Sequence, residues 1–156
     1  MSRRETPEDG FTLIEAVCAM AIIGLLAAVL LPNVPHQTSR PRLEAYAIQV
    51  ATLLKTDRNA AIGNRLEVTT EIDAPARMVR SGATGEILRI PDDVRFDAVL
   101  PRTCNNRMVG GVVSFFASGM SCGGAITLSR RDTGFEIQVN WLTGRIDVAS
   151  RDNIIK

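Results

Sequence analysis

Three successive patterns of apolar and polar residues divide this chain. The first is an apolar run from Phe11 to Leu31, which contains one ionisable side chain, Glu15, and is followed by Pro32. A helix over these residues would be about 30 Å long, the thickness of the hydrocarbon core of a bilayer. The run therefore predicts a transmembrane helix at 11–31. A carboxylate in hydrocarbon costs about 3 kcal/mol, so we expect Glu15 to have a function.

The second pattern is a short segment rich in proline, residues 32–41. Pro32, Pro35 and Pro41 lie within ten residues of one another. Each interior proline removes a backbone donor and costs a helix about 3 kcal/mol, so the segment predicts a joint between two helical regions. His36, the one histidine of the chain, lies in this joint without a nearby Cys, Asp or Glu, which is typical of a solvated linker residue rather than of a metal ligand.

From Pro41 onward the apolar residues recur every three or four positions, which predicts an amphipathic helix. The apolar stripe consists of Leu43, Ala47, Val50, Leu54 and Ala61. Pro41 suits the first turn of a helix, and Gly63-Asn64 suits its end. The stripe is expected to pack on a sheet, and packing against a partner helix is the alternative.

After Gly63 the period drops to two, which is the pattern of half-buried strands. Leu66, Val68, Thr70 and Ile72 alternate with polar residues. Further strands are predicted at Glu86–Ile90, Val94–Val99, Val112–Phe116, Ala125–Ser129, Phe135–Trp141 and Arg145–Ala149. One helix followed by six or seven strands with short turns predicts an α+β domain over 42–156, in which the helix packs on one antiparallel β-sheet.

Composition and motifs argue against catalysis and against nucleic-acid binding by a basic tract. The net charge is +1, acids and bases are interspersed, and the chain has one Trp and one Tyr. The predicted globular domain has no histidine and no G-x-S-x-G motif. Ser118, Asp92, Asp93 and Asp132 fall in predicted turns, where solvated loop residues are the simplest interpretation. We therefore expect a protein that is not an enzyme and needs no cofactor or metal.

The sequence Gly10-Phe11-Thr12-Leu13-Ile14-Glu15 resembles the processing site of type IV prepilins and type II secretion pseudopilins. The resemblance implies that residues 1–10 are a leader peptide, that a prepilin peptidase cuts after Gly10, and that Phe11 becomes N-methylated. It also implies that Glu15 pairs with the amino terminus of a neighbouring subunit during assembly. An amine is a natural partner for a carboxylate in lipid. An uncleaved signal anchor or a secretory signal peptide is the alternative, although this apolar run is longer than a signal-peptide core and contains an acid.

Four segments of the strand region resemble the carboxy-terminal part of minor pseudopilins and pilins of the GspH/FimT type. They are Ser114–Gly119, Gly123–Leu128, Phe135–Val139 and Leu142–Ile146, and Arg58–Ile62 near the helix end is similar too. The resemblance implies a pilin-like fold, a single pass through the inner membrane and a periplasmic carboxy-terminal domain. Inner-membrane lipid and the other pseudopilins of the fibre would be its partners.

Three functions remain open at this stage. The first is a minor pseudopilin of the type II secretion system, a subunit of the pseudopilus that helps export folded proteins across the outer membrane. The second is a FimT-like minor pilin of a type IV pilus with a role in DNA uptake. Arg145, Arg151 and Lys156 favour it, but Asp147 and Asp152 accompany them. The third is a signal-anchored periplasmic enzyme or binding protein.

The cysteines follow from this placement. Cys104 and Cys122 lie in the domain that the resemblance assigns to the periplasm, where an oxidising environment favours a disulfide worth about 3 kcal/mol. A metal site is the rival interpretation, but the domain offers no further Cys or His ligands. Cys18 is expected to be a small apolar residue of the membrane helix, with its thiol reduced.

Overall fold

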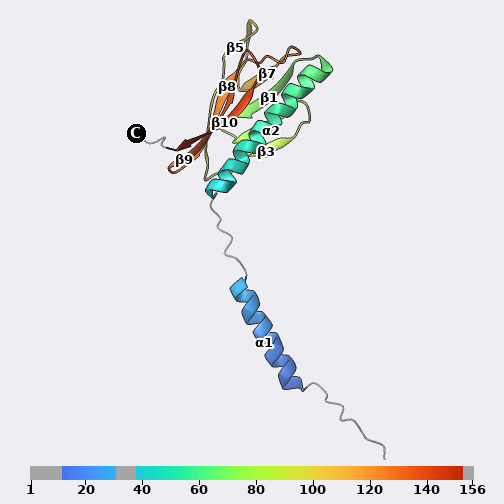
Figure 1. Cartoon of the computed structure of the whole chain (residues 1–156), viewed down its shortest axis with the longest axis vertical. Helices are drawn as coiled ribbons and strands as arrows, with labels where there is room; N and C mark the ends of the chain where they lie inside the picture. The colour runs from blue at the N-terminus through green and yellow to red at the C-terminus, as the bar shows by residue number, and fades with distance from the viewer. Residues whose placement is uncertain (1–11, 31–37, 153–156) are drawn as a thin grey trace, which may run out of the picture. The chain divides into compact units, whose positions relative to one another are not determined.

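The computed structural model describes residues 12–30 and 38–152. The chain divides into two units, Met1–His36 and Gln37–Lys156 (Figure 1). Gly10, Phe11 and most of the predicted proline-rich joint lie outside the described residues.

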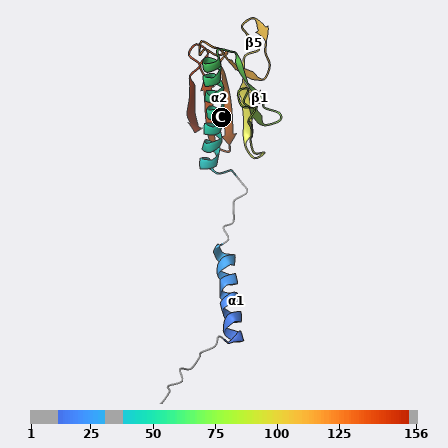
Figure 2. The ribbon, with the colours of Figure 1, turned by 90° about the vertical axis from the view of Figure 1, so that its right-hand side faces the viewer.

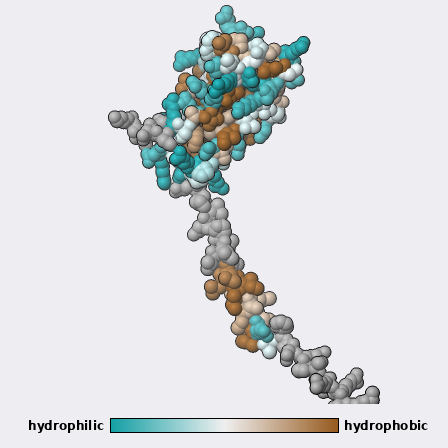
Figure 3. Space-filling model, in the orientation of Figure 1, coloured by the Kyte–Doolittle hydropathy of each residue, from teal (hydrophilic) through white to brown (hydrophobic). Residues whose placement is uncertain are grey.

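The first unit contains helix α1, Leu13–Leu30. The helix begins where the backbone amides of Glu15 and Ala16 donate to the carbonyl oxygen of Thr12. Its described side chains are exposed, and Figure 3 shows that they are apolar over most of the visible surface. Cys18 has a free thiol on this helix. Within the described residues, no helix is both long and apolar enough to count as a membrane span.

The second unit begins with helix α2, Arg40–Asn64. The predicted stripe is confirmed, because its five residues are all nearly inaccessible to solvent: Leu43, Ala47, Val50, Leu54 and Ala61. Pro41 lies in the first turn, as predicted, where a missing amide costs no helical hydrogen bond. Gly63 remains helical and Arg65 forms the cap in the left-handed conformation, with its amide donating to the carbonyl of Ala61.

Within residues 38–152, the described part of this unit, ten strands follow α2, and they form two four-stranded antiparallel sheets and one small hairpin. In chain order they are β1 (Val68–Asp73), β2 (Met78–Arg80), β3 (Ile87–Arg89), β4 (Arg95–Val99), β5 (Thr103–Cys104), β6 (Arg107–Met108), β7 (Val112–Phe115), β8 (Gly124–Arg130), β9 (Thr133–Val139) and β10 (Ile146–Asp152). The first sheet has the order β3-β2-β1-β7, the second has the order β10-β9-β8-β4, and β5 pairs with β6. The prediction of a single sheet was therefore wrong, while the α+β class is correct.

The division into two sheets occurs between β7 and β8. Strand β7 pairs with β1, whereas β8 pairs with β4 and β9, so the two consecutive strands do not form a hairpin. Gly123 and Gly124 both have positive φ at this point and redirect the chain. Ser121 links the two sheets, because it forms a bridge to Phe115 and its amide donates to the carbonyl of Trp141 at 2.9 Å.

Helix α2 covers both sheets and closes the core. It contacts β1 and β7 of one sheet and β8, β9 and β10 of the other, and Figure 2 shows the strands to either side of it. The largest fully buried side chains of the core come from the helix and from both sheets; they include Leu43, Leu54, Val79, Val113, Phe115, Ile126, Leu128 and Ile137. This shared core positions the loops at the carboxy-terminal end of α2. Several of the segments that resemble the GspH/FimT type meet there.

Candidate functional site

The described part of the predicted assembly site is Glu15, which lies exposed in the first turn of α1. A negative charge is favourable there, because the first helical turn carries the positive end of the helix dipole. Helix α1 contains no Lys, Arg or His, so a cation that pairs with Glu15 must come from outside this helix. The other two predicted residues, Gly10 and Phe11, lie outside the described residues.

The structure joins the two cysteines of the second unit. Cys104 in β5 and Cys122 form a disulfide, with their Cα atoms 5.7 Å apart, a typical separation. The Cys122 amide also donates to the carbonyl oxygen of Ser114 at 3.0 Å. The disulfide and this hydrogen bond together tie the β5–β6 hairpin to β7. Among the described residues, no three His, Cys, Asp or Glu side chains converge as a metal site would require.

Arg58 connects three segments that carry the GspH/FimT resemblance. Its Nε donates to the carbonyl oxygen of Gly119 at 3.2 Å, and a terminal nitrogen donates to the carbonyl oxygen of Thr143 at 3.0 Å. A Cβ atom on Gly144 would lie 2.1 Å from the same Gly119 oxygen, so only glycine fits. The sequence singled out these segments, and the structure shows that Arg58 fastens the helix to both loops.

A second polar anchor, centred on Asp57, was not predicted. Its carboxylate is fully buried on α2 and accepts four hydrogen bonds, from the hydroxyls of Thr70 and Ser81 and from the amides of Gly82 and Ala83. The distances from donor to acceptor run from 2.5 to 3.1 Å. One signal was visible in the sequence, an acid on the apolar side of an amphipathic helix. Its partners were not recognisable, because they follow in separate segments.

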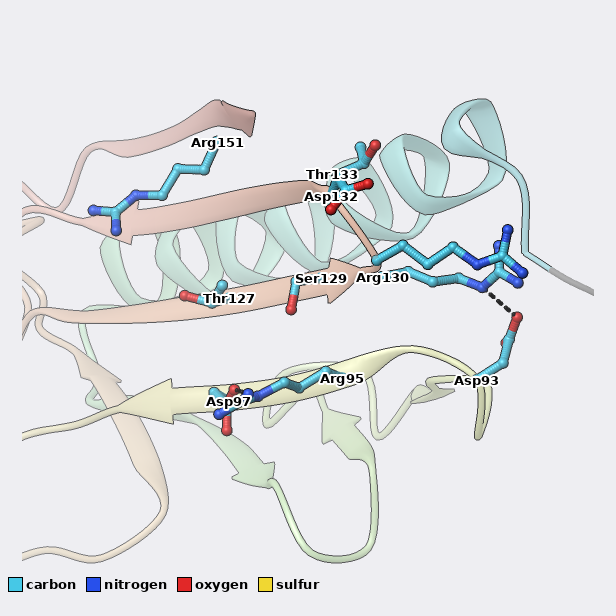
Figure 4. Close-up of a pocket in the computed structure, with 10 residues that line it drawn as sticks. Asp93, Arg95, Asp97, Thr127, Ser129, Arg130, Asp132, Thr133 and Arg151 are labelled. Atoms are coloured by element: carbon cyan, nitrogen blue, oxygen red, sulfur yellow. Dashed lines mark hydrogen bonds and ion pairs between the residues drawn. The ribbon is translucent and has the colours of Figure 1, made fainter. Parts of the chain in front are cut away.

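A third anchor holds the residues that precede α2. The amide and hydroxyl of Thr38 donate to Asp93 at 2.7 and 2.8 Å, and the Nε of Arg130 lies 3.0 Å from the same carboxylate (Figure 4). The hydrogen bonds from Thr38, with the charge of Arg130, hold the pKa of Asp93 below its ordinary value of 3.8. Asp92, Asp93 and Asp132 all lie exposed in turns, as predicted, and Asp93 is in addition held by Thr38 and Arg130.

The outward face of the β10-β9-β8-β4 sheet is polar. Figure 4 shows Arg95 and Asp97 of β4 beside Thr127 and Ser129 of β8, on the side of the sheet away from α2. Arginines in this sheet or next to it pair with acids: Arg95 with Asp97, Arg130 with Asp93, Arg145 with Asp147 and Arg151 with Glu136. The basic stripe that would favour DNA binding is therefore neutralised over its described part, and Lys156 lies outside the described residues.

By sequence, the chain resembles a known motif and a known protein. Residues 7–31 match the prokaryotic N-terminal methylation motif. The chain is 28% identical over 139 residues to type II secretion system protein H of Xanthomonas campestris pv. campestris. The aligned region covers 88% of this chain and 80% of that protein.

Comparison with solved structures gives the same fold in two kinds of protein. The minor pseudopilin EpsH from the type 2 secretion system of Vibrio cholerae matches with a TM-score of 0.54 and 11% identity, over 69% of this chain and 96% of that chain. The type IV minor pilin FimU of Pseudomonas aeruginosa matches with a TM-score of 0.50 and 16% identity, over 72% of this chain and 91% of that chain. These likenesses establish a pilin-like fold.

Proposed function

We propose that this chain, a GspH/FimT-like protein in motif, sequence and fold, is a minor pseudopilin of a type II secretion system. It would be a structural, non-catalytic subunit of the periplasmic pseudopilus that helps export folded proteins across the outer membrane. The observation that carries the proposal is the sequence likeness to type II secretion system protein H, which extends over 88% of this chain. The methylation motif at residues 7–31 supports it independently.

The proposal assigns a role to each part of the chain. Residues 1–10 are a leader, 11–31 anchor the protein in the inner membrane in a single pass, 32–41 form the joint, and 42–156 are the periplasmic domain. A prepilin peptidase cuts after Gly10, Phe11 is methylated, and Glu15 pairs with the amino terminus of a neighbouring subunit. The lack of a basic residue in α1 supports an intermolecular partner for Glu15.

A minor pilin of a type IV pilus is the second candidate, because FimU shares the fold. In that role the chain would assemble with other pilins, and a part in DNA uptake would require a cationic surface. The ion pairs of Arg95, Arg145 and Arg151 with nearby acids speak against such a surface on the outward sheet face. A signal-anchored periplasmic protein is the third candidate, and the methylation motif argues against it.

Deletion of the gene in the bacterium that encodes it tests the proposal. We expect the deletion to block secretion of exported proteins into the medium and to leave pili intact, and we expect the wild-type gene to restore secretion. Loss of pili with normal secretion would favour the type IV pilus instead. Intact-mass analysis of the membrane-extracted protein tests processing: a mature chain that begins at N-methylated Phe11 is expected, and Gly10→Val should leave the full-length precursor.

A further inference from the structure

Exposed apolar side chains gather where α2 ends. Ile62 and Leu66 come from the last turn of α2 and the residues after it, Met120 from the loop after β7, and Trp141 and Leu142 from the turn after β9. We call these five residues the apolar pole. The contacts around the loop bring them together: a Cβ on Gly119 would lie 3.3 Å from Ile62, and the Ser121 amide donates to Trp141.

The exposure of the apolar pole is high for side chains of this size. Trp141, the single tryptophan of the chain, is 62% exposed and Leu142 is 54% exposed. The turn that carries them is held firmly, because Arg58 donates to the carbonyl oxygen of Thr143 and the side-chain oxygen of Asn140 accepts from the amides of Leu142 and Thr143 at 3.0 Å. Arg58 also donates to the carbonyl oxygen of Gly119 in the loop that carries Met120. Rigid exposed aromatic and aliphatic side chains are the residues that anchor protein interfaces.

A basic hollow adjoins the apolar pole. It measures about 460 Å³ and is lined by Lys55, Arg58 and Asn59 of α2 and by Thr143, Arg145 and Ile146 of the last turn and strand. Arg145 pairs with Asp147, and Arg58 uses two nitrogens on backbone oxygens. Lys55 makes no ion pair or hydrogen bond with another described residue, so the hollow keeps an excess of positive charge.

The apolar pole and the basic hollow lie side by side, and together they indicate what kind of molecule binds there. Charge complementarity calls for carboxylates opposite Lys55 and Arg58, and the apolar pole calls for aliphatic or aromatic side chains beside them. A nucleic acid fits less well, because a duplex needs cations spaced along several phosphates and gains little from exposed leucine and isoleucine. A folded protein partner satisfies both requirements.

We infer that the apolar pole and the basic hollow together form the docking surface for an acidic, apolar-tipped segment of a sibling pilin-like subunit. This inference rests on the proposed function and specifies the partner surface. Lys55 and Arg58 bind the carboxylates of that segment, while Trp141 and Leu142 cover its apolar side chains. The outward face of the β10-β9-β8-β4 sheet, with its paired charges, stays free.

Photo-crosslinking in the bacterium that encodes the chain tests the inference. The photoreactive amino acid p-benzoylphenylalanine replaces Leu142 in the full-length protein, and Arg95, on the outward sheet face, is the control position. We expect position 142 to crosslink to a pilin-like subunit identified by mass spectrometry, and position 95 to give background. Lys55→Glu should lower the crosslink yield at 142 about tenfold, since it opposes the carboxylates, whereas Arg95→Glu should leave it unchanged.

The result that overturns the inference is a yield at 142 no higher than at 95, or a yield that Lys55→Glu does not change. A nuclease-sensitive adduct at 142 would assign the surface to nucleic acid and overturn it too. Secretion by the unsubstituted chain is measured in the same strain. Normal, gene-dependent secretion with no crosslink at 142 refutes the docking surface alone, whereas secretion that does not depend on the gene refutes the proposed function.

Discussion

The Nε of Arg58 donates a hydrogen bond to the carbonyl oxygen of Gly119, and the would-be Cβ of Gly144 points at that same oxygen from 2.1 Å. The end of α2 and two loops thus meet at one backbone atom. Arg58, Gly119 and Gly144 all fall in segments that resemble the GspH/FimT family, and their close approach depends on the missing side chain of Gly144.

Gly144→Ala should lower the free energy of unfolding far more than Gly85→Ala. Both glycines have positive φ, at +62° and +73°, so alanine strains the backbone by about 1–2 kcal/mol at either site. Around Gly85 nothing lies within 4 Å, whereas a Cβ on Gly144 would also meet Arg58 Nε at 2.8 Å. Urea unfolding of the purified protein measures the difference, and equal losses for the two variants would contradict it.

Asp57→Ala should destabilise the protein by about 3 kcal/mol or more, because it leaves two buried hydroxyls and two amides without their acceptor. Asp73→Ala is the matched control, since the Asp73 carboxylate accepts one exposed bond from the Ala76 amide and should cost about 1 kcal/mol. Denaturant midpoints of both variants test this. A small effect of Asp57→Ala would mean that the residues 81–83 are held by other contacts.

The contribution of Asp93 to stability should be lost in acid. Its pKa in the folded protein lies below the ordinary value of 3.8, so the unfolded chain takes up the proton first. The stabilisation is therefore complete well above pH 3.8 and disappears as the pH falls through the lower folded value. Unfolding free energies of wild type and Asp93→Asn, measured from pH 6 downward, should converge; Thr38→Val, which removes a donor to Asp93, should show a smaller pH dependence.

Non-reducing peptide mapping of protein from the membrane fraction should find Cys104 linked to Cys122 and Cys18 as a free thiol. Replacing both linked cysteines by serine should lower stability by about 3 kcal/mol, because an 18-residue separation is no longer closed in the unfolded chain. Cys18→Ser is the control and should leave unfolding of the globular unit unchanged. Two alkylatable thiols at 104 and 122 under oxidising conditions would contradict the pairing.

Periodicity predicted the parts of the fold that depend on burial along one element. The apolar stripe of α2 and the alternation of buried and exposed residues in β1 are local patterns of the sequence. Both can be predicted without knowing which element packs against them. The choice between one sheet and two depends instead on which strands pair, and nothing in the pattern of β7 or β8 specifies that. Strands of two or three residues, such as β2 and β5, are too short to show a period.

The hydrogen-bond partners of Asp57 and Asp93 could not be predicted from the sequence for a related reason. Arg130 and Thr38 are separated by 92 positions, and Asp57 meets donors up to 26 residues away. A single sequence shows an acid or a hydroxyl but not its distant partner, so Asp93 resembled any turn residue. Arg58 was noticed because of its family resemblance, and its hydrogen bonds became visible only in the structure.

Glu15→Leu should impair assembly of the fibre and leave the globular unit unchanged. Glu15 lies exposed in the first turn of α1, in a helix without a basic residue, and it is not one of the buried residues that form the core. The leucine should raise the affinity for the membrane, since a carboxylate in hydrocarbon costs about 3 kcal/mol. Under the proposed pairing, removal of the carboxylate leaves the amine of Phe11 in an adjacent subunit without its partner, so incorporation should fall. Secretion assays and crosslinking to the other subunits measure incorporation, and intact mass reports cleavage after Gly10.

Glu44→Leu is the control for the same chemical change, because Glu44 is an exposed acid on α2. Wild-type secretion and wild-type crosslinks in Glu15→Leu would refute the pairing role, and an uncleaved precursor would instead place Glu15 in recognition by the peptidase.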